Sequence, residues 1–354
     1  MSTVPARGEG TRSNTVGVAV VGAGYWGPNL IRNLAEAPGA ELLTICDEDE
    51  GRLQTVGRRY PATALETDLG EVLKDDSIEG LIIATPAATH HDLAIRAMEA
   101  GKDVLVEKPL ALNVAQCRAL VECARKNDRI LMVGHTFLFN AAVRCIKDLH
   151  DSGELGDVLY VYASRVNLGR IRQDVNALWN VAPHDISIVN YVLGEEPTRV
   201  RAMGRSFLQP GIEDVVFAMF EYPGGAVVHI HASWLDPSKV RKATFVGSKK
   251  MVVYDDVETE GKIKIYDKGV RRQGPDAEYG EFQLKLHSGD IHIPKITFTE
   301  PLAEECAHFV DCVTNRKTPR TDGRQGLSVV AALEAAQKSL EAGGEVFEIE
   351  SSDG

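Results

Sequence analysis

The amine of Lys108 is of a type, and stands at a position, that could take part in catalysis. It stands in Val104-Leu105-Val106-Glu107-Lys108-Pro109, where an apolar segment typical of a buried strand ends at a carboxylate, an amine and a proline. Open α/β sheets bind their ligands at the carboxyl ends of their strands. Because Pro109 lacks a backbone N–H and restricts Lys108 to extended geometry, we expect the chain to leave the sheet here, through a trans or a cis bond. An amine at such an edge can stabilise a developing alkoxide, although a surface lysine before a loop proline would give the same pattern.

His184 is the second residue of this kind, and it stands in Trp179-Asn180-Val181-Ala182-Pro183-His184-Asp185-Ile186. Pro183 predicts a helix that begins at this point and ends at Gly194, and it argues against one continuous helix through both Asn180 and His184. Near a helix N-terminus the dipole disfavours the imidazolium ion. A neutral imidazole can act as a general base near pH 7, whereas a histidine among apolar helix residues is often structural.

A short basic stretch precedes this segment in an otherwise acidic chain. It contains Arg165, Asn167, Arg170 and Arg172. Guanidinium forks suit the recognition of a carboxylate or a phosphate. If these side chains face the active site, the substrate carries negative charge; the alternative is that they are solvent-facing arginines of a surface loop.

The elements that position these residues begin with a dinucleotide-binding pattern. An apolar segment of strand length, residues 16–21, is followed by Gly22-Ala23-Gly24-Tyr25-Trp26-Gly27 and by a helical pattern. The first glycine permits a tight turn, the second lets the backbone approach a pyrophosphate, and the third lets helix pack on strand. The following strand, residues 42–46, ends at Asp47, whose carboxylate would accept hydrogen bonds from the adenosine ribose. Acidic residues at 48–50 favour NAD over NADP, unless they simply begin a solvated helix.

Strand and helix patterns continue to alternate as far as about residue 140. Further strands are expected near 63–65 and at 79–84, 104–106 and 130–133, with helices between them. Thr85, Pro86 and His90 follow one strand end and are candidates to touch the nicotinamide half of the cofactor; a proline turn with a cap from Thr89 explains the same residues. We predict a disordered tail at 1–14 and a doubly wound parallel sheet at 15–140.

The second part of the chain, residues 141–354, is rich in strand patterns. Strands are expected at 157–167, 198–207, 215–222, 226–234, 242–246, 251–254, 262–266 and 346–349, and helices at 142–151, 300–314 and 326–342. Alternation such as Val228-His229-Ile230-His231-Ala232 predicts a large open, mostly antiparallel sheet with helices on one face. Its other face would be solvated or would meet another subunit. Residues 268–298 show no pattern that places them.

Composition excludes several classes of protein. The chain of 354 residues has a formal net charge of -12, which argues against a nucleic-acid surface. No apolar segment is long enough for a membrane span, and the polar start is no signal peptide. Six cysteines lack the spacing of metal ligands. We therefore expect a cytoplasmic protein with reduced thiols and no structural metal.

These motifs together resemble the Gfo/Idh/MocA oxidoreductases along nearly the whole chain. The resemblance rests on the glycine motif, Ala84-Thr85-Pro86 with His90, Glu107-Lys108-Pro109, a helix-opening His184, and Thr321-Asp322-Gly323 before a late helix. It implies a Rossmann domain and an open-sheet domain, NAD(P) chemistry on sugars, cyclitols or nucleotide-sugars, and dimers or tetramers formed through the open sheet. Lys108 then matches the family's active-site lysine and His184 its catalytic histidine. Many members have an aspartate where this chain has Asn180, and an amide cannot relay a proton.

We therefore expect an NAD-dependent dehydrogenase or ketoreductase that acts on a secondary alcohol or ketone of a sugar-like substrate. His184 would take the hydroxyl proton, Lys108 would hydrogen-bond the same oxygen, and Glu107 would orient this region or contact a ribose. The alternatives are an NAD- or sugar-sensing regulator without catalysis and a dehydrogenase of small non-carbohydrate substrates.

Overall fold

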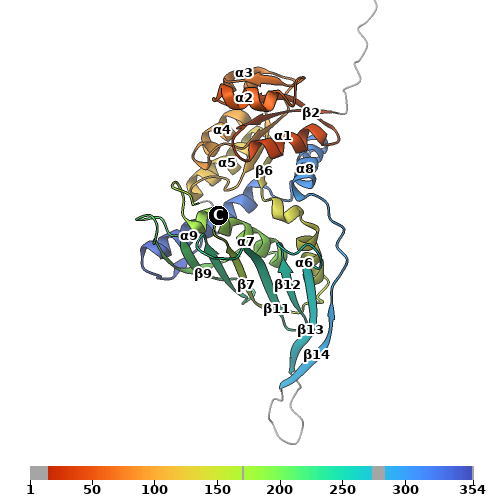
Figure 1. Cartoon of the computed structure of the whole chain (residues 1–354), viewed down its shortest axis with the longest axis vertical. Coiled ribbons are helices and arrows are strands. Elements are labelled where there is room, and N and C mark those ends of the chain that lie inside the picture. Colours follow the sequence, from red (N-terminus) through yellow and green to blue (C-terminus); the bar gives the residue numbers. More distant parts are fainter. Residues whose placement is uncertain (1–14, 170, 273–283, 353–354) are drawn as a thin grey trace, which may run out of the picture.

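The computed structural model consists of two β-sheets with helices packed around the first and between the two (Figure 1). It describes residues 15–169, 171–272 and 284–352, so the tail expected at 1–14 lies outside the described residues. The first sheet and its helices lie at one end of the molecule, and the second, larger sheet lies at the other.

The first sheet is parallel throughout its described strands. Its order is β3-β2-β1-β4-β5-β6, which is a doubly wound arrangement in which the order reverses at β1 and β4. The strands are β1 (Val16–Val21), β2 (Ala40–Cys46), β3 (Ala64–Glu66), β4 (Gly80–Ile83), β5 (Asp103–Glu107) and β6 (Leu131–Gly134).

Helices cover both faces of this sheet, which is why its central strands are apolar along their whole length. The helices are α1 (Gly27–Glu36), α2 (Glu50–Gly57), α3 (Leu69–Lys74), α4 (Ala87–Glu99) and α5 (Val114–Asn127). Alternate residues of β1 serve the two faces: Val18 and Val20 pack in the core with α1, whereas Ala19 and Val21 pack in the core with α4 and α5.

The second sheet is mostly antiparallel, with one parallel pair formed by β7 and β10. Its order in the described residues is β14-β13-β12-β11-β7-β10-β9-β8-β15. The strands are β7 (Val158–Val166), β8 (Arg199–Arg205), β9 (Val215–Glu221), β10 (Val227–Ser233), β11 (Val240–Gly247), β12 (Met251–Asp255), β13 (Ile263–Arg272), β14 (Leu284–His292) and β15 (Phe347–Glu348). The predicted fold class, a parallel Rossmann sheet followed by a large open sheet, is confirmed.

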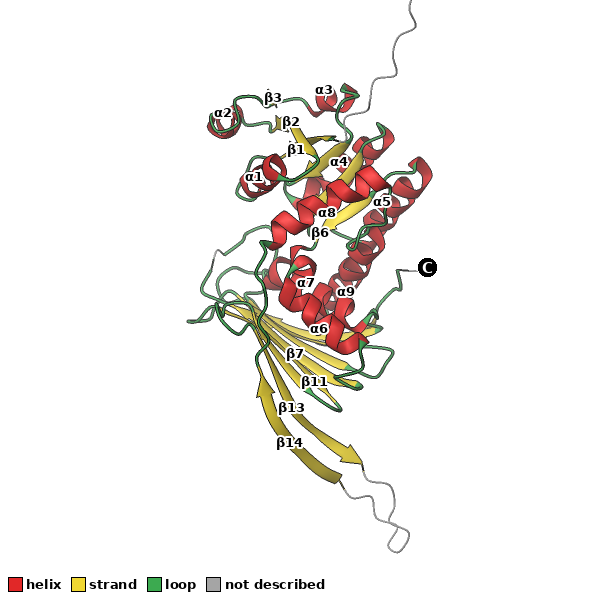
Figure 2. Ribbon diagram, turned by 90° about the vertical axis from the view of Figure 1, so that its right-hand side faces the viewer, coloured by secondary structure: helices red, strands yellow, loops and turns green. Residues whose placement is uncertain are grey.

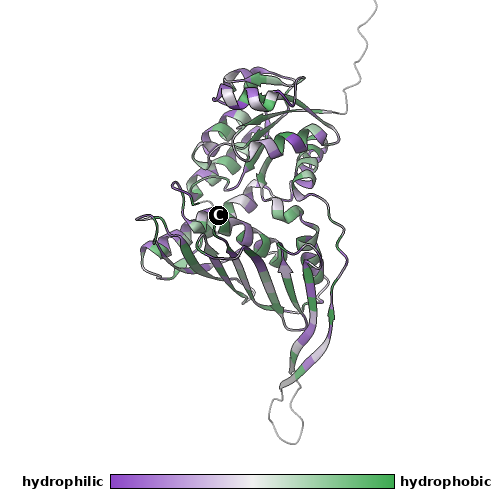
Figure 3. Cartoon of the chain, in the orientation of Figure 1, coloured by the Kyte–Doolittle hydropathy of each residue, from purple (hydrophilic) through white to green (hydrophobic). Residues whose placement is uncertain are grey.

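In the part of the chain that the structure describes, helices cover one face of the second sheet and leave the other without helices (Figure 2). They are α6 (Ala141–Asp151), α7 (Ala177–Leu193) and α9 (Gly323–Glu341), and a 3₁₀ helix, η1 (Thr136–Phe139), leads into them. Along these strands buried residues alternate with partly or fully exposed ones, as expected for a sheet covered on one face. Figure 3 shows hydrophobic and hydrophilic residues mixed along the same strands.

Residues 268–298, which the sequence pattern does not place, are partly accounted for by β13 and β14. These two strands pair antiparallel and extend away from the body of the sheet as a two-stranded ribbon (Figure 1). Leu286 is 81% exposed, so the ribbon lacks the buried face that produces a readable alternation. Residues 273–283 lie outside the described part of the chain.

Two late helices connect the halves of the molecule. Helix α8 (Pro301–Asn315) returns to the first sheet, where Leu302 and Phe309 join the core of α1. Helix α9 contributes Leu327 and Val330 to the core of the first sheet and Leu333 to the core of the second. The predicted domain boundary near residue 140 therefore remains a prediction. It marks the place where the chain first leaves the Rossmann sheet.

Two further sequence features can be compared with the described residues. All six cysteines are described and none forms a disulfide. No helix in the described residues is long and apolar enough to cross a membrane.

Candidate active site

The glycine motif forms a turn between β1 and α1 in which each glycine has a steric reason. Gly22 has a φ of +103°, and a Cβ there would lie 2.7 Å from the Ala84 carbonyl oxygen. A Cβ on Gly27 would lie 1.9 Å from the Gly22 carbonyl oxygen, so helix and turn can touch only without it. A Cβ on Gly24 would meet nothing within 4 Å, so this part of the turn is open to a ligand.

The start of α1 and the end of β2 provide the groups that a dinucleotide needs. The α1 N-cap, Trp26, makes no side-chain cap bond. Pro28 has no N–H, and the Asn29 N–H donates to the Trp26 carbonyl oxygen at 2.9 Å. The Gly27 N–H is therefore the group of the first turn that could meet a pyrophosphate. Asp47 is 8% exposed, and its two carboxylate oxygens accept hydrogen bonds from the N–H groups of Ala23 (2.6 Å) and Asp49 (2.9 Å). Held in this way beside the glycine turn, Asp47 can accept a ribose hydroxyl, so the residues present fit NAD.

Tyr25 and Trp26 extend from the glycine turn and differ in their contacts. Tyr25 is 85% exposed. The Trp26 indole N–H donates to Oε1 of Glu107 at 2.6 Å and so ties the nucleotide turn to the end of β5. Burial raises the pKa of Glu107 to about 7, despite the neighbouring Lys108 and Trp26. Glu107 therefore contributes to the shape of the site through Trp26.

Thr85 and Pro86 lie at the carboxyl edge of the first sheet, directly after β4, where the sequence places them. The structure gives His90 a different role from the expected cofactor contact. His90 is 1% exposed, and its ring nitrogens lie 2.9 Å from the carbonyl oxygens of Thr85 and Pro109. It therefore braces the turn after β4 against the turn after β5, and it acts on the site by positioning Lys108.

Lys108 and α7 come together at the end of β5. The Lys108–Pro109 bond is cis. The Lys108 amine, Nζ, donates to the backbone carbonyl oxygen of Asn180 at 3.2 Å. Asn180 and His184 are four residues apart and therefore lie on the same face of α7, one turn from each other. The two predicted catalytic side chains thus reach one region from segments that lie far apart in the sequence.

The prediction that a helix begins at Pro183 is wrong. Helix α7 begins at Ala177, capped by Asn176, whose side-chain oxygen accepts from the Trp179 N–H at 3.1 Å, and it continues through Pro183. Pro183 has no N–H to donate to the carbonyl group one turn earlier. His184 is therefore well inside the helix, and its protonation is set by its surroundings, not by the helix N-terminus.

Burial and nearby cations keep the imidazole of His184 neutral. Burial holds its pKa well below the usual range, and the charges of Lys108 and Arg165 lower it further. Its Nδ1 is buried without a hydrogen-bond partner, and its ring contacts Phe137 edge-on with 4.9 Å between centroids. Burial also lowers the pKa of Lys108, although Glu107 opposes this shift. The imidazole of His184 is therefore neutral near pH 7, as a general base must be.

The predicted basic stretch divides into three cases. Arg165 is buried and pairs with Asp185 through Nε–Oδ2 and Nη2–Oδ1 distances of 2.8 and 2.9 Å. Because these bonds occupy its guanidinium inside the protein, Arg165 does not fit the predicted role of binding a substrate. Arg172 pairs with Asp174 and is partly exposed, and its charge also lowers the pKa of Lys108. Asn167 follows β7, and its side chain lies against its own loop at Gly169. Arg170 lies outside the described residues.

Several residues around the site were missed by sequence reasoning. His135 follows β6, is 1% exposed, and has both ring nitrogens without a partner; burial lowers its pKa to about 3. The Arg165 guanidinium lies over the ring of Phe137 at 4.6 Å, which links the Arg165–Asp185 pair to His184. Glu305 of α8 is buried beside Glu107. His135 directly follows a strand in the first sheet, which is a signal that could have marked it.

Two cavities in the described part of the chain lie away from Lys108 and His184, and the described residues offer no metal site. Two surface cavities, one of about 360 Å³ beside β14 and one of about 560 Å³ at the C-terminal end of α7, are lined by neither Lys108 nor His184. The described residues contain no group of three histidine, cysteine or acidic side chains that could hold a metal ion.

Comparisons with known proteins identify the family of the chain. A model of the family described as "Oxidoreductase family, NAD-binding Rossmann fold" matches residues 16–135, and a model of the GFO/IDH/MocA C-terminal domain matches residues 143–253. The scyllo-inositol 2-dehydrogenase (NAD(+)) of Bacillus subtilis strain 168 is 32% identical over 315 residues, which cover 85% of this chain and 87% of that protein. The 2,7-anhydro-N-acetylneuraminate hydratase of Mediterraneibacter gnavus is 31% identical over 206 residues, 56% of this chain and 54% of that protein.

A solved structure extends the likeness to the whole molecule. The crystal structure of GenD2 from gentamicin A biosynthesis, in complex with NAD, superposes with a TM-score of 0.80 at 25% identity and covers 99% of this chain and 100% of that one. Two matched family models and a relative that is 32% identical over 85% of this chain point to the same family. The chain belongs to the Gfo/Idh/MocA family of oxidoreductases, and residues 16–135 form its NAD-binding Rossmann domain.

Proposed function

We propose that the protein transfers a hydride between NAD and a secondary alcohol or ketone of a sugar-like substrate. The observation that carries the proposal is the hydrogen bond from the Lys108 amine to α7 at Asn180, one turn before His184, at the edge of the sheet where the glycine turn lies. NAD, when bound, supplies the hydride acceptor. Every other step falls to side chains of the chain itself.

His184 is the proposed general base in the oxidising direction. Its neutral imidazole takes the hydroxyl proton of the substrate, and in the reducing direction the imidazolium returns it. Lys108 hydrogen-bonds the same oxygen and stabilises the negative charge that develops on it. Because burial lowers the pKa of Lys108, its amine can share the proton role. Asn180 cannot, since an amide has no proton to exchange in this range, and it positions the substrate.

The test replaces each of the two side chains and separates chemistry from cofactor binding. Lys108→Met and His184→Asn should each lower kcat by about 10²–10⁴-fold for any sugar or cyclitol that the wild type oxidises, because each variant loses acid–base or electrostatic assistance. NADH formation at 340 nm measures turnover, and titration calorimetry measures the affinity for NAD, which should stay near the wild-type value. Lys126→Met, at an exposed site on α5, is the matched control.

Two outcomes would contradict the proposal. Unchanged turnover in Lys108→Met would remove the lysine from the reaction. A wild-type protein that binds NAD but reduces it with no member of a panel of inositols, hexoses, amino sugars and nucleotide-sugars would favour a sensing role.

We also infer that the chain forms a homodimer or homotetramer through the uncovered face of the second sheet. Five large apolar side chains on this face are between 46% and 53% exposed: Tyr160, Tyr162, Met203, Phe217 and Met219. They lie on β7, β9 and β8; β10 lies between β7 and β9, and Phe217 pairs with Met203 across β8 and β9. Exposed apolar side chains that gather on one face in this way are typical of a protein–protein contact. The six unpaired cysteines favour a reducing compartment such as the cytoplasm.

A further inference from the structure

Arg241, a residue of β11 outside the predicted basic stretch, lies directly opposite Arg165 of β7. The two form a cross-strand pair in the antiparallel ladder, and their neighbours Ala243 and Ala163 are buried under the helices. Arg165 and Arg241 therefore both point to the helix-covered face of the sheet, where α7 lies. Like charges directly opposite each other destabilise a sheet unless something compensates them.

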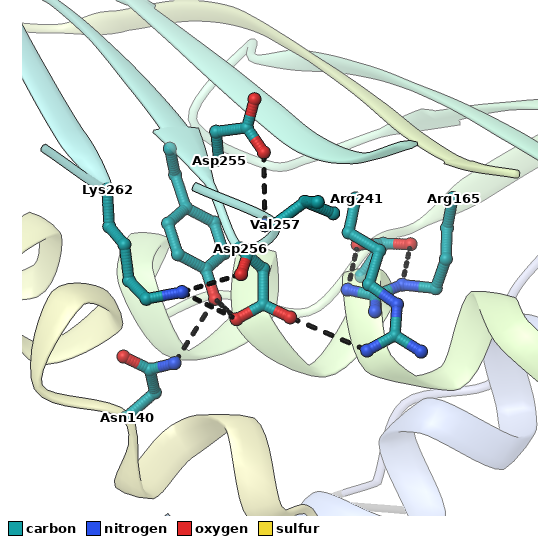
Figure 4. A network of polar contacts seen from close by, with 9 residues as sticks. Asn140, Arg165, Arg241, Asp255, Asp256, Val257 and Lys262 are labelled. Atoms are coloured by element: carbon teal, nitrogen blue, oxygen red, sulfur yellow. Dashed lines mark hydrogen bonds and ion pairs between the residues drawn. The ribbon is translucent and has the colours of Figure 1, made fainter. Parts of the chain in front are cut away.

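The carboxylates around the pair do not compensate both arginines equally. Asp185 makes two hydrogen bonds to Arg165 and is fully engaged. Arg241 has Asp256, but Nη1 and Oδ2 are 3.5 Å apart, which is longer than a hydrogen bond. Asp256 also lies 3.8 Å from the Lys262 amine, so one carboxylate is shared between two cations. Figure 4 shows Arg165 and Arg241 side by side and Asp256 between Arg241 and Lys262.

This cluster keeps one positive charge that no carboxylate within it balances. It contains Arg165, Arg241 and Lys262 as cations and only Asp185 and Asp256 as anions. The side chain of Arg241 is 38% exposed, in contrast to 6% for Arg165. Arg241 can therefore bind a ligand without first leaving a buried, bidentate partner, which Arg165 cannot do.

The position of Arg241 relative to the proposed reaction is also informative. Arg241 lies beside Arg165, whose guanidinium lies over the Phe137 ring, and that ring contacts His184. A small substrate that meets Lys108 and His184 at one end can therefore extend toward Arg241 at the other. The residual charge of one unit matches a carboxylate better than a phosphate dianion, and a planar guanidinium matches the geometry of a carboxylate.

We propose that Arg241 binds a carboxylate carried by the sugar substrate, so that the protein acts on sugar acids in preference to neutral sugars. The proposal rests on the proposed function, since it names the substrate class of the same site. Arg241 is then a specificity-determining residue, Asp256 holds its guanidinium, and the Arg165–Asp185 pair forms the floor beside it.

The experiment compares substrates that share a sugar ring and differ in the group at C6, which is neutral, a carboxylate or a phosphate. Hexoses, the corresponding hexuronates and the corresponding 6-phosphates are offered to the full-length protein with NAD, and kcat/KM is measured for each. We expect the wild type to favour uronates over the neutral sugars at least tenfold. Arg241→Gln should bring the ratio of acid to neutral kcat/KM close to one, mainly through the KM of the acid. Arg241→Lys, which keeps the charge but not the fork, should retain part of the ratio.

The outcomes of this experiment separate failure of the carboxylate inference from failure of the proposed function. Arg58→Gln, at an exposed site in the first half of the chain, should leave the ratio and the turnover unchanged. An equal loss for acid and neutral sugars in a folded Arg241→Gln, or a wild-type preference for the 6-phosphate, overturns the carboxylate assignment while leaving the dehydrogenase intact. If no sugar is oxidised, the proposed function fails. Calorimetric binding of uronates in the presence of NAD then tests Arg241 alone, and equal affinity in wild type and Arg241→Gln overturns the inference.

Discussion

The Arg165–Asp185 pair offers a sharp test of how this site is held together, because both partners are buried. Their side chains are 6% and 4% exposed, and the pair is bidentate. Asp185→Asn keeps the shape of the side chain but leaves the guanidinium of Arg165 without a counter-charge. Removing one partner of a buried pair costs about 3–5 kcal/mol, since the remaining charge is neither solvated nor paired.

The chain contains a matched exposed pair that serves as the control. Arg172 and Asp174 make the same kind of fork, but their side chains are 40% and 57% exposed. Water screens such a pair, so Asp174→Asn should cost less than about 1 kcal/mol. The comparison isolates burial, because the chemical groups and the substitution are the same.

Thermal unfolding followed by circular dichroism gives the readout. At roughly 2–4 °C per kcal/mol, Asp185→Asn should lower Tm by about 6–20 °C and Asp174→Asn by no more than about 4 °C. The double variant Arg165→Met with Asp185→Leu should recover much of the loss, since it leaves no buried charge. The reasoning is refuted if Asp185→Asn is as stable as Asp174→Asn, or if the double variant is less stable than Asp185→Asn.

Three further predictions follow from other parts of the structure. Gly24→Val should weaken NAD binding at least tenfold by calorimetry while the Tm without NAD stays unchanged, because a Cβ there meets no protein atom but would enter the space of the pyrophosphate; an unchanged affinity would place the cofactor elsewhere. Phe217→Asp should shift the mass measured by light scattering toward the monomer, and an unaltered mass would exclude this face as the interface. His135→Asn should make the stability of the protein less sensitive to acid. The pKa of His135 is about 3 in the folded state and about 6.5 in the unfolded state, so below pH 6.5 protons bind preferentially to the unfolded state. The free energy of unfolding of the wild type therefore falls by about 1.4 kcal/mol per pH unit in this range. The Tm of the variant should therefore fall less than that of the wild type between pH 7 and pH 5, and equal slopes would rule out this titration.

Local signals in the sequence were sufficient where geometry is decided by neighbours along the chain. The glycine turn is one example, because Gly22 adopts a positive φ and Gly27 touches the Gly22 carbonyl oxygen within the turn. Lys108 is another, since a strand followed by a proline places an amine at the edge of the sheet. The Asn176 cap and the burial of α7 outweighed the effect of Pro183, because tertiary packing can stabilise a helix across one missing hydrogen bond.

Pairings between distant residues could not be read from the sequence. Arg165 was expected to meet a substrate, but it meets Asp185 across the packed interface of β7 and α7. His90 was expected near the cofactor, but two backbone carbonyl groups take its ring nitrogens. Arg241 was not considered, because only the register of β11 against β7 brings it beside Arg165. In each case the residue type could be read from the sequence, but the partner of that residue depended on how distant segments pack together.

The return of α8 to the first sheet limits how this protein can be cut and recombined. Leu302, Phe309 and Val310 fill the interior beside α1, so a fragment that stops near residue 140 would lack part of its own core and expose an apolar strip. A chimera that exchanges substrate halves between relatives should therefore keep α8 with the nucleotide half from the same parent. Placing the junctions at both ends of α8, and not at one point, would keep the α1–α8 part of this core from one parent, whereas Leu327 and Val330 of α9 would still come from the other.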